Sequence, residues 1–456
     1  MYAKNAWLKY DEKAFKEVMD FCEGYKDYIS KGKTERVCVT EAVKIAEANG
    51  FKDINTFEVL KKGDKVYSIN RNKNVALFVI GEKSMDKGLH ILGAHIDSPR
   101  LDVKQNPLYE KNDLVFLDTH YYGGIKKYQW VTTPLAVYGV VVKKDGTKVD
   151  INIGDAEGDP IFGITDLLIH LAGSQMKKTA DVAIEGEDLD LSFGSIPLKD
   201  EEKESVKVNI LKLLKEKYDF EEEDFISAEL EIVPAGKARD YGIDRGMIAG
   251  YGHDDRVCAY TSLMALIDAG ECEYTTCCIL VDKEEVGSIG ATGAQSKYFE
   301  NVVAEVISKT TAYNDILLRK AFENSKMLSS DVSAGFDPLY PSVNEAKNTA
   351  YLSKGLCINK YTGARGKSGC NDSSPEFIAE IRKVFDEANV NYQTSELGKV
   401  DQGGGGTIAY ILGNYNMDVI DAGVPVLNMH SPMEIVSKAD VYEAYKRYVS
   451  FLKNIK

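Results

Sequence analysis

The sequence predicts an α/β fold whose sheet is covered on both faces, with a second, β-rich segment inserted into it. Two runs, residues 75–80 and 90–94, are mostly apolar without alternation, which is typical of strands that have helices on both faces. Amphipathic segments at residues 11–30 and 374–388 have helical spacing. From about residue 101 to residue 232 the pattern changes to short β-prone runs separated by turns.

We therefore expect a discontinuous first domain at residues 1–100 and 234–456, and an inserted domain at residues 101–233. The residues suited to chemistry lie on both sides of the insertion, and few lie within it. Inside the insertion, residues 165–171 resemble a short helix. A charge-rich stretch with an apolar stripe follows at residues 199–224.

Three local signals follow the insertion. Asp254-Asp255 opens an amphipathic helix that Gly270 is placed to close. Residues 302–307 form an apolar, valine-rich run and predict a strand. The run Ser437-Lys438-Ala439-Asp440 predicts a capping box at the start of the last helix.

Composition restricts the classes of partner. The chain has 456 residues, 44% of them hydrophobic and 28% charged, as in ordinary globular proteins. With 56 basic and 71 acidic side chains its formal charge is −15, which disfavours nonspecific binding to nucleic acid or anionic membrane. No apolar run is long enough to span a bilayer. The 8 cysteines form no CxxC pair and indicate reduced core thiols, so we expect a cytoplasmic protein.

The pair Glu284-Glu285 is the clearest sign of chemistry. It follows the apolar run at residues 277–281 and precedes a glycine-rich turn. Adjacent carboxylates at the end of a buried strand repel each other and lose hydration. The pair is stable if one carboxylate binds a cation and the other meets water or a proton. The alternative is a solvated pair in a surface turn.

His95 and His430 both follow apolar runs. Asp97 stands two residues after His95, where an extended chain points both side chains to one side, so its carboxylate is placed to hold the imidazole. The alternatives are an Asp-Ser-Pro turn beside an incidental histidine at residue 95, and a core histidine at residue 430. For Asp254-Asp255 the alternative is helix capping.

Taken together, these histidines and carboxylates suit a pair of divalent ions such as Zn²⁺, Mn²⁺ or Co²⁺. A doubled site needs a bridging carboxylate, and either Asp254 or Asp255 is placed to supply it. Two such ions polarise a carbonyl group and generate hydroxide at neutral pH. A carboxylate that is not a ligand then relays the proton, which accounts for the pairing of Glu284 with Glu285.

The ordered motifs resemble the aspartyl aminopeptidase family of dinuclear metallo-exopeptidases, and the resemblance covers nearly the whole chain. The motifs are Ala94-His95-Ile96-Asp97, His253-Asp254-Asp255-Arg256, Asp282-Lys283-Glu284-Glu285-Val286-Gly287, Ser330-Asp331 and Met429-His430-Ser431. The resemblance implies a three-layer α/β/α catalytic domain with a mixed sheet, interrupted by a β-rich domain that serves in assembly.

The resemblance also implies a role for each motif residue. One ion would bind His95, Asp331 and Asp254, and the other would bind Asp254, Glu285 and His430. Asp254 is favoured as the bridge because the family's bridging aspartate is followed by Asp or Asn. Glu284 would be the general base, and Asp97 would orient His95. Zinc is the first choice of metal, with manganese and cobalt as alternatives.

The family removes one residue, often Asp or Glu, from the N-terminus of a peptide. It assembles as a tetrahedral homododecamer built from dimers, in which a histidine of the inserted domain reaches a neighbour's site. His170 matches that histidine, and Lys360 matches a lysine that meets the acidic side chain of the substrate. The resemblance therefore implies peptide substrates and identical copies of the chain as partners.

This sequence departs from the family pattern at two places near the expected substrate. Ala334 stands where the family usually has a histidine, and residues 361–372 differ from the commonest family form. Two rival functions remain on the residues alone. One is a tetrahedral glutamyl or deblocking aminopeptidase of different specificity, and the other is a self-assembling scaffold or cargo protein without turnover.

Overall fold

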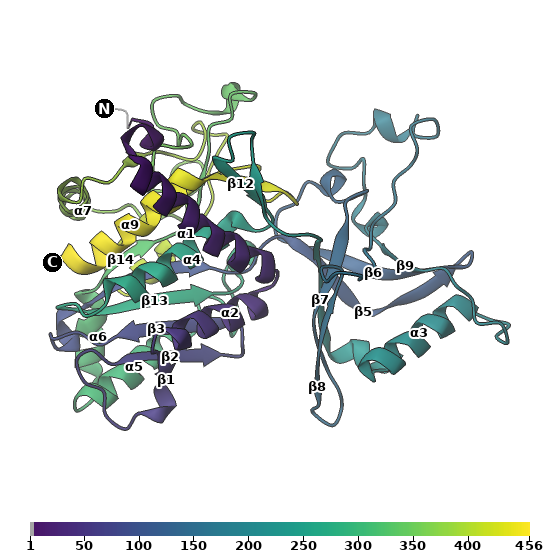
Figure 1. Ribbon diagram of the computed structural model, residues 1–456, viewed down its shortest axis with the longest axis horizontal. Helices are drawn as coiled ribbons and strands as arrows, with labels where there is room; N and C mark the ends of the chain where they lie inside the picture. The colour runs from purple at the N-terminus through teal and green to yellow at the C-terminus, as the bar shows by residue number, and fades with distance from the viewer. Residues whose placement is uncertain (1–3) are drawn as a thin grey trace. The chain divides into compact units, whose positions relative to one another are not determined.

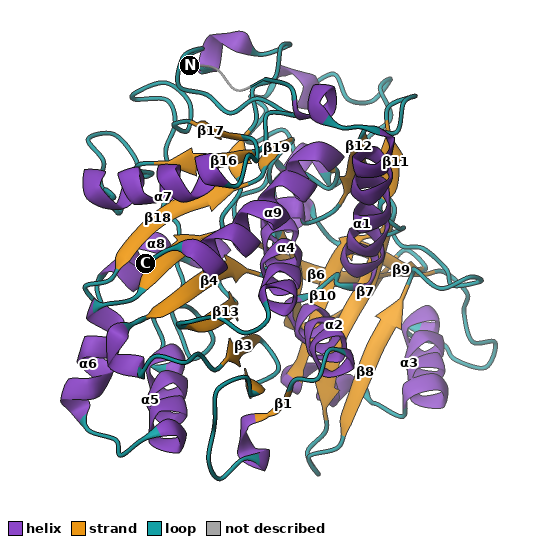
Figure 2. Ribbon diagram, turned by 60° about the vertical axis from the view of Figure 1, so that its left-hand side comes forward, coloured by secondary structure: helices purple, strands orange, loops and turns teal. Residues whose placement is uncertain are grey.

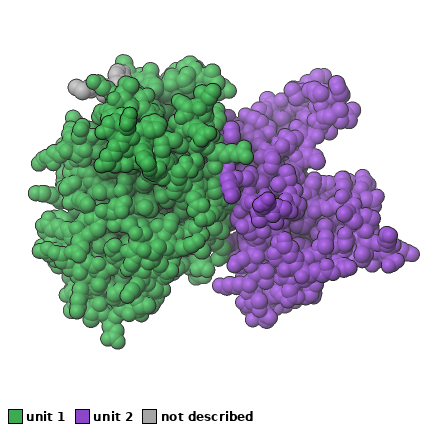
Figure 3. Space-filling view, viewed as in Figure 1, with its two compact units in different colours: residues 1–97, 238–429, 434–456 green, residues 98–237, 430–433 purple. Residues whose placement is uncertain are grey.

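The computed structural model of the protein describes residues 4–456 and divides into two compact units. The first unit comprises the chain up to Asp97 together with residues 238–429 and 434–456. The second comprises residues 98–237 and 430–433. Figure 3 shows the first unit in green and the second in purple. Within residues 4–456, none of the helices combines the length and the apolar character needed to cross a bilayer.

The first unit is built on a mixed sheet of 9 strands (Figure 1). The central strands β13, β4, β14 and β18 run parallel, while β3 is antiparallel to β13 and β16 is antiparallel to β18. In spatial order the strands are β1 (Lys52–Asp53), β2 (Lys65–Asn70), β3 (Asn74–Val79), β13 (Thr275–Val281), β4 (Leu89–His95), β14 (Lys326–Ser329), β18 (Asp418–Gly423), β16 (Leu356–Asn359) and β17 (Tyr392–Thr394).

Helices cover both faces of this sheet. Because successive side chains of a strand point to opposite faces, neighbouring strand residues pack into different cores. Leu92 and Cys278 pack with one group of helices, and Ile91 and Cys277 pack with the other. The first group is α1 (Glu12–Lys31), α2 (Glu35–Ala48), α4 (His253–Ala269), α7 (Pro375–Glu387) and α9 (Lys438–Asn454). The second group is α5 (Tyr298–Thr310), α6 (Asp315–Glu323) and α8 (Ala409–Gly413). The predicted α/β fold class is confirmed.

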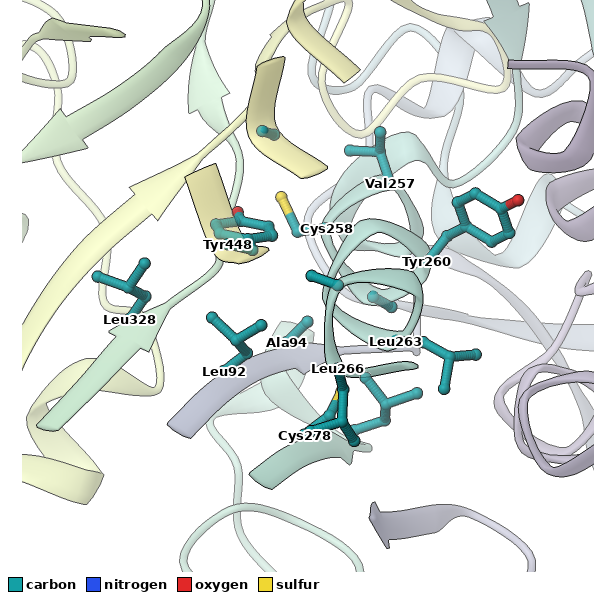
Figure 4. Packing of buried hydrophobic residues seen from close by; sticks show 14 of the residues in the cluster. Leu92, Ala94, Val257, Cys258, Tyr260, Leu263, Leu266, Cys278, Leu328 and Tyr448 are labelled. Carbon is teal, nitrogen blue, oxygen red and sulfur yellow. The ribbon is translucent and has the colours of Figure 1, made fainter. Parts of the chain in front are cut away.

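Helix α4 lies at the centre of the first core. It contacts α1, α9 and the strand β4 (Figure 2). Figure 4 shows Leu266 of α4 beside Cys278 of the sheet. Nearly every residue of α4 is buried, as expected for a helix surrounded by other elements. This packing fixes the N-terminus of α4 near the ends of the central strands.

The structure corrects three local predictions. Residues 302–307 belong to helix α5, because Val302, Val303, Val306 and Ile307 all face one core from positions that are one and four residues apart. The spacing of residues 40–49 predicts a short helix there, but helix α2 already begins at Glu35, with Thr34 as its N-cap. Residues 165–171 are turns and irregular chain, since their apolar side chains are exposed and nothing packs on them to support a helix.

The predicted capping box at the last helix is also wrong. Ser437 is the N-cap of α9, but its side chain makes no capping hydrogen bond. Its hydroxyl lies 2.9 Å from the hydroxyl of Ser353. Asp440 accepts the backbone N–H groups of Ser353 and Gly355, both at 2.6 Å. These side chains therefore fasten a distant loop instead of closing their own helix.

Two smaller sheets complete the fold. The first unit also contains a sheet of 5 strands, β11 (Arg239–Tyr241), β12 (Met247–Gly250), β20 (Glu434–Ser437), β19 (Pro425–Leu427) and β15 (Ser333–Ala334). The second unit contains an antiparallel sheet of 6 strands and the helix α3 (Ser205–Tyr218). Its strands are β8 (Lys148–Ile153), β7 (Leu135–Val142), β10 (Ala228–Pro234), β5 (Arg100–Lys111), β6 (Leu114–Tyr122) and β9 (Leu191–Gly194).

Candidate metal centre

Three parallel strands of the first unit end at the same edge of the sheet. Val281 at the end of β13 is paired with His95 at the end of β4. Ser329 at the end of β14 is paired with Gly93. Asp331 follows β14 by two residues, and Glu284 follows β13 by three. Ligands in α/β sheets bind at such carboxyl ends, so the topology alone brings the predicted side chains to one place.

The first turn of α4 adds Asp254 to this edge. Its Oδ1 lies 3.1 Å from Nε2 of His95, and its backbone N–H donates to Oε2 of Glu434 at 3.0 Å. Gly252 turns the chain into the helix with φ of 76°, a left-handed conformation that glycine adopts without steric cost. The peptide bond between Asp254 and Asp255 is cis.

The two nitrogens of His95 have different surroundings. Nε2 faces the carboxylates: Oδ1 of Asp254 at 3.1 Å, and Oε2 of Glu284 and Oδ1 of Asp331 at 4.0 Å each. Nδ1 lies 3.1 Å from the carbonyl oxygen of Asp97 and 3.3 Å from its Oδ1. A metal-binding histidine commonly donates its second ring N–H to a carboxylate or carbonyl in this manner.

The turn that carries Glu284 and Glu285 is held by buried carboxylates. Asp97 accepts the backbone N–H of Glu284 at 3.1 Å and that of Glu285 at 3.2 Å. Asp282 accepts the backbone N–H of Lys283 at 2.8 Å and the hydroxyl proton of Thr292 at 2.6 Å. The two glutamates are therefore fixed relative to His95 through their backbone.

At this edge of the sheet, potential ligand atoms gather into three groups, each with all its atoms within 4.8 Å of one another. The groups are His95, Glu284 and Asp331; His95, Asp254 and Glu285; and Asp254, Asp255 and Asp331. Imidazole and carboxylate donors of this kind suit zinc and other borderline divalent ions. Asp254 belongs to two groups and Asp255 to one.

The charges in this cluster favour a cation. Burial would lower the pKa of His95, but hydrogen bonds to Asp254 and Asp97 raise that pKa well above its ordinary value. Burial raises the pKa of Asp331 well above its usual range; the charge of His95 opposes this shift, while that of Glu284 reinforces it. Burial likewise raises the pKa of Asp255, helped by the charge of Asp331. A divalent cation would replace the protons that these groups otherwise hold.

The buried carboxylate of Asp255 also favours a cation at this site. Both of its carboxylate oxygens are buried, and among residues 4–456 the thiol of Cys258, a weak donor, is the hydrogen-bonding neighbour beside them. A buried carboxylate with so little compensation is costly. The residues present therefore fit a divalent metal.

The remaining predicted site residues are His430, His170, Lys360 and the departure at Ala334. His430 belongs to the second unit, where its Nδ1 lies 2.9 Å from the carbonyl oxygen of Gly124; among residues 4–456 the three groups above do not include it. His170 is exposed in the irregular segment of the second unit. Lys360 is exposed directly after β16, and Ala334 lies in β15.

Glu434 also belongs to the site, although no motif in the sequence marks it. It is buried at the start of β20 and holds the backbone of Asp254. The only local signal was a glutamate directly before the apolar pair Ile435-Val436, where a solvated charge is not expected.

Comparison with known proteins identifies the family. The family described as Aminopeptidase I zinc metalloprotease (M18) matches residues 28–452. The chain belongs to this family. A probable M18 family aminopeptidase 1 of Clostridium acetobutylicum is 62% identical to this M18 chain, over 99% of this chain and 98% of the relative.

Solved structures agree with the family. An M18 aminopeptidase from Thermotoga maritima superimposes with a TM-score of 0.96 at 44% identity, covering 99% of both chains. Aminopeptidase I from Clostridium acetobutylicum superimposes with a TM-score of 0.93 at 60% identity, also covering 99% of both. The S. cerevisiae mApe1 dodecamer, at 21% identity, shares the fold with a TM-score of 0.77 over 95% of this chain and 97% of the other.

Membership of the M18 family confirms the predicted resemblance and the predicted enzyme class. The chain is a zinc metallo-aminopeptidase, a hydrolase that acts as an exopeptidase. The predicted use of a metal is confirmed at the level of the family, which is a zinc metalloprotease family.

Proposed function

We propose that this M18 aminopeptidase uses two divalent ions to remove a single N-terminal residue, preferably Asp or Glu, from peptides. One observation carries the proposal: Nε2 of His95 faces Asp254 and Asp331, while Nδ1 is held by Asp97. An imidazole held in this way is oriented for a metal on its Nε2 side. Zinc is the proposed ion, with manganese or cobalt as alternatives.

Asp254 is proposed as the ligand shared by both ions. The first ion takes His95, Asp331 and Asp254, and the second takes Asp254, Glu285 and His430. The grouping of Asp254 with His95 and Glu285, and separately with Asp331, supports this choice over Asp255. When bound, the ions would polarise the peptide carbonyl and lower the pKa of a water molecule.

Glu284 is proposed as the general base. Its carboxylate lies 4.0 Å from His95, and its side chain keeps 17% exposure, more than the 2% of His95. Its backbone is fixed by Asp97, so the carboxylate is held at the cluster while remaining accessible to water. It would accept the proton of the attacking water and donate it to the leaving amine.

The variant Glu284→Gln tests this role. Turnover should fall by roughly 10²–10⁴-fold, the range for loss of a general acid–base group. Metal content should remain at the wild-type level, because the amide keeps the shape of the side chain. Glu305→Gln, a half-exposed glutamate paired with Lys309, is the matched control. A Glu284→Gln variant with wild-type turnover would reject the assignment.

Specificity for acidic residues rests on the family resemblance and on Lys360. A panel of aminoacyl-anilides compares Asp and Glu with Leu and Met. Faster cleavage of the Leu or Met substrates would contradict the proposed acidic specificity. It would favour an aminopeptidase of the glutamyl or deblocking type. If the purified chain binds no metal and shows no turnover after addition of Zn²⁺, Mn²⁺ or Co²⁺, the result would favour the rival function of a self-assembling scaffold or cargo protein without turnover.

We also propose that the inserted segment, residues 101–233, serves in assembly of a cytoplasmic homododecamer. Its irregular part exposes five large apolar side chains with 53–69% exposure: Leu167, Leu168, Ile169, Leu171 and Met176. Contiguous exposed apolar residues are typical of interaction surfaces, and the related yeast mApe1 is a dodecamer. His170, in this same run, would then reach a neighbour's site. A fully active monomer in sizing chromatography would overturn this part.

A further inference from the structure

Arg256 is a buried cation next to the proposed metal ligands. It stands in α4, two residues after Asp254, and is only 1% exposed. Its Nε donates to the carbonyl oxygen of Ile96 at 3.2 Å, and its Nη2 donates to the carbonyl oxygen of Lys33 at 3.2 Å. The guanidinium lies 5.1 Å from the ring centre of Tyr251. A guanidinium with this planar fork can hold two acceptors at a fixed spacing.

The position of the Ile96 backbone affects two residues of the proposed metal centre. Ile96 stands between His95 and Asp97 in the chain, so a movement of its backbone moves both side chains. The N–H of the same residue donates to the carbonyl oxygen of Val281, at the end of β13, at 2.9 Å. The two peptide groups that flank the Cα of Ile96 are therefore held from different sides, one by the end of β13 and the other by Arg256.

The carbonyl of Lys33 supplies the second anchor. Lys33 is buried and precedes Thr34, the N-cap of α2. Arg256 thus joins three segments of the first unit: the start of α4, the end of β4 and the corner before α2. Because α4 also carries Asp254, the guanidinium directly couples the elements that supply two of the proposed ligands, His95 and Asp254.

We propose that Arg256 is a positioning residue, which sets His95 against Asp254 and thereby sets the affinity of the centre for its metal. This inference rests on the proposed roles of His95 and Asp254. Burying a guanidinium is costly, and a mere core position would be filled more stably by an apolar side chain. Removing the donor would leave the Ile96 carbonyl buried without its hydrogen bond and free to move with both flanking side chains.

Arg447 provides a matched control. It is also fully buried, at 0% exposure, and it also donates to a backbone carbonyl, that of Phe385. Its guanidinium lies over the rings of Phe385 and Tyr392, in α7 and β17. Loss of either arginine should lower the stability of the fold, but only Arg256 is joined to the segment that carries His95.

The test compares the full chain with Arg256→Gln, Arg256→Lys and Arg447→Gln. Each protein is freed of metal, its unfolding is followed in urea, and its affinity for Zn²⁺ is measured by competition with a chromophoric chelator. Arg256→Gln should bind zinc roughly 10–100-fold more weakly, as for loss of an outer-shell partner. Arg447→Gln should bind zinc like the wild type, although its unfolding midpoint also falls.

If Arg256→Gln does not fold, the zinc affinity of Arg256→Lys tests the inference instead. The ammonium keeps the charge but cannot span both carbonyls, so its zinc affinity should lie below that of the wild type. Wild-type zinc affinity in a folded Arg256 variant would overturn the inference, as would equal weakening of zinc binding in Arg447→Gln. A wild-type chain that binds zinc but cleaves no peptide contradicts the proposed function alone.

Discussion

The carboxylate of Asp97 accepts the backbone N–H groups of Glu284 and Glu285, at 3.1 and 3.2 Å. The same carboxylate lies 3.3 Å from Nδ1 of His95. One fully buried side chain therefore sets the orientation of an imidazole on β4 and of a turn that follows β13. Its role is wider than the second-partner role that the spacing of His95 and Asp97 predicts.

Asp97→Asn should weaken zinc binding by roughly 10–100-fold. The amide retains one oxygen, while its NH₂ group faces a backbone N–H and repels it, so the turn loses one of its two anchors. Zinc affinity is measured by chelator competition. Asp64→Asn is the control, since Asp64 also accepts a backbone N–H, that of Lys61 at 2.7 Å, in an exposed turn. Equal zinc affinity in Asp97→Asn and wild type would contradict the prediction.

Asp331→Asn should separate stability from metal binding. Burial and the charge of Glu284 raise the pKa of Asp331, so the metal-free fold bears the cost of an acidic cluster that the amide relieves. The metal-free variant should therefore unfold at a higher temperature than the metal-free wild type. Free zinc at 100 times Kd stabilises a folded protein by about 2.7 kcal/mol, and the variant should lose most of this gain.

Calorimetry of both proteins, with and without zinc, measures the four melting temperatures. A variant that gains as much from zinc as the wild type would show that Asp331 is not a ligand. A metal-free variant that melts below the metal-free wild type would show that the buried carboxylate does not destabilise the fold.

The position of the site at the strand ends could be predicted, because residues suited to binding a metal directly follow apolar runs in the sequence. Apolar runs precede both His95 and Glu284, and parallel strands bring their carboxyl ends together. The fold class follows from the same runs. Local pattern also suffices for α7, which begins at Pro375 with Ser374 as its N-cap.

What could not be predicted depends on partners far along the chain. The side chain of Arg256 donates to the carbonyl oxygen of Lys33, 223 residues away in the sequence. The backbone N–H of Asp254 donates to Glu434, 180 residues away. Asp440 looks like half of a capping box, yet it serves the loop at Ser353 and Gly355. No local spacing encodes such pairs, because tertiary packing decides which acceptor a buried donor meets.

Ile169→Asp tests the proposed assembly and should reduce the mass of the protein in solution. Ile169 is 67% exposed in the inserted segment, and a carboxylate placed in an apolar interface would lose its hydration. Sizing chromatography with light scattering measures the mass. Ile243→Asp is the control, since Ile243 is exposed in the first unit. Unchanged mass in Ile169→Asp would show that this segment is not part of the interface.

His90 should make the fold less stable in mild acid. Burial lowers the pKa of His90 from 6.5 to about 4, and its ring stacks on Tyr274 with ring centres 4.4 Å apart. Above pH 6.5 the imidazole is neutral in both the folded and the unfolded chain. As pH falls from 6.5 towards 4, the unfolded chain binds a proton that the folded chain excludes, so stability is lost across that window.

The loss should be about 1.4 kcal/mol per pH unit within the window, up to about 3 kcal/mol. His90→Gln removes this contribution, because the amide does not titrate but still donates to the carbonyl oxygen of Leu452, which lies 3.1 Å from Nδ1 of His90. Urea unfolding at pH 7 and pH 5 gives the difference for each protein, and it should be smaller in the variant. Tyr274→Phe keeps the stacked ring and should retain the wild-type difference. Equal differences in wild type and His90→Gln would show that His90 does not contribute to the acid sensitivity of the fold.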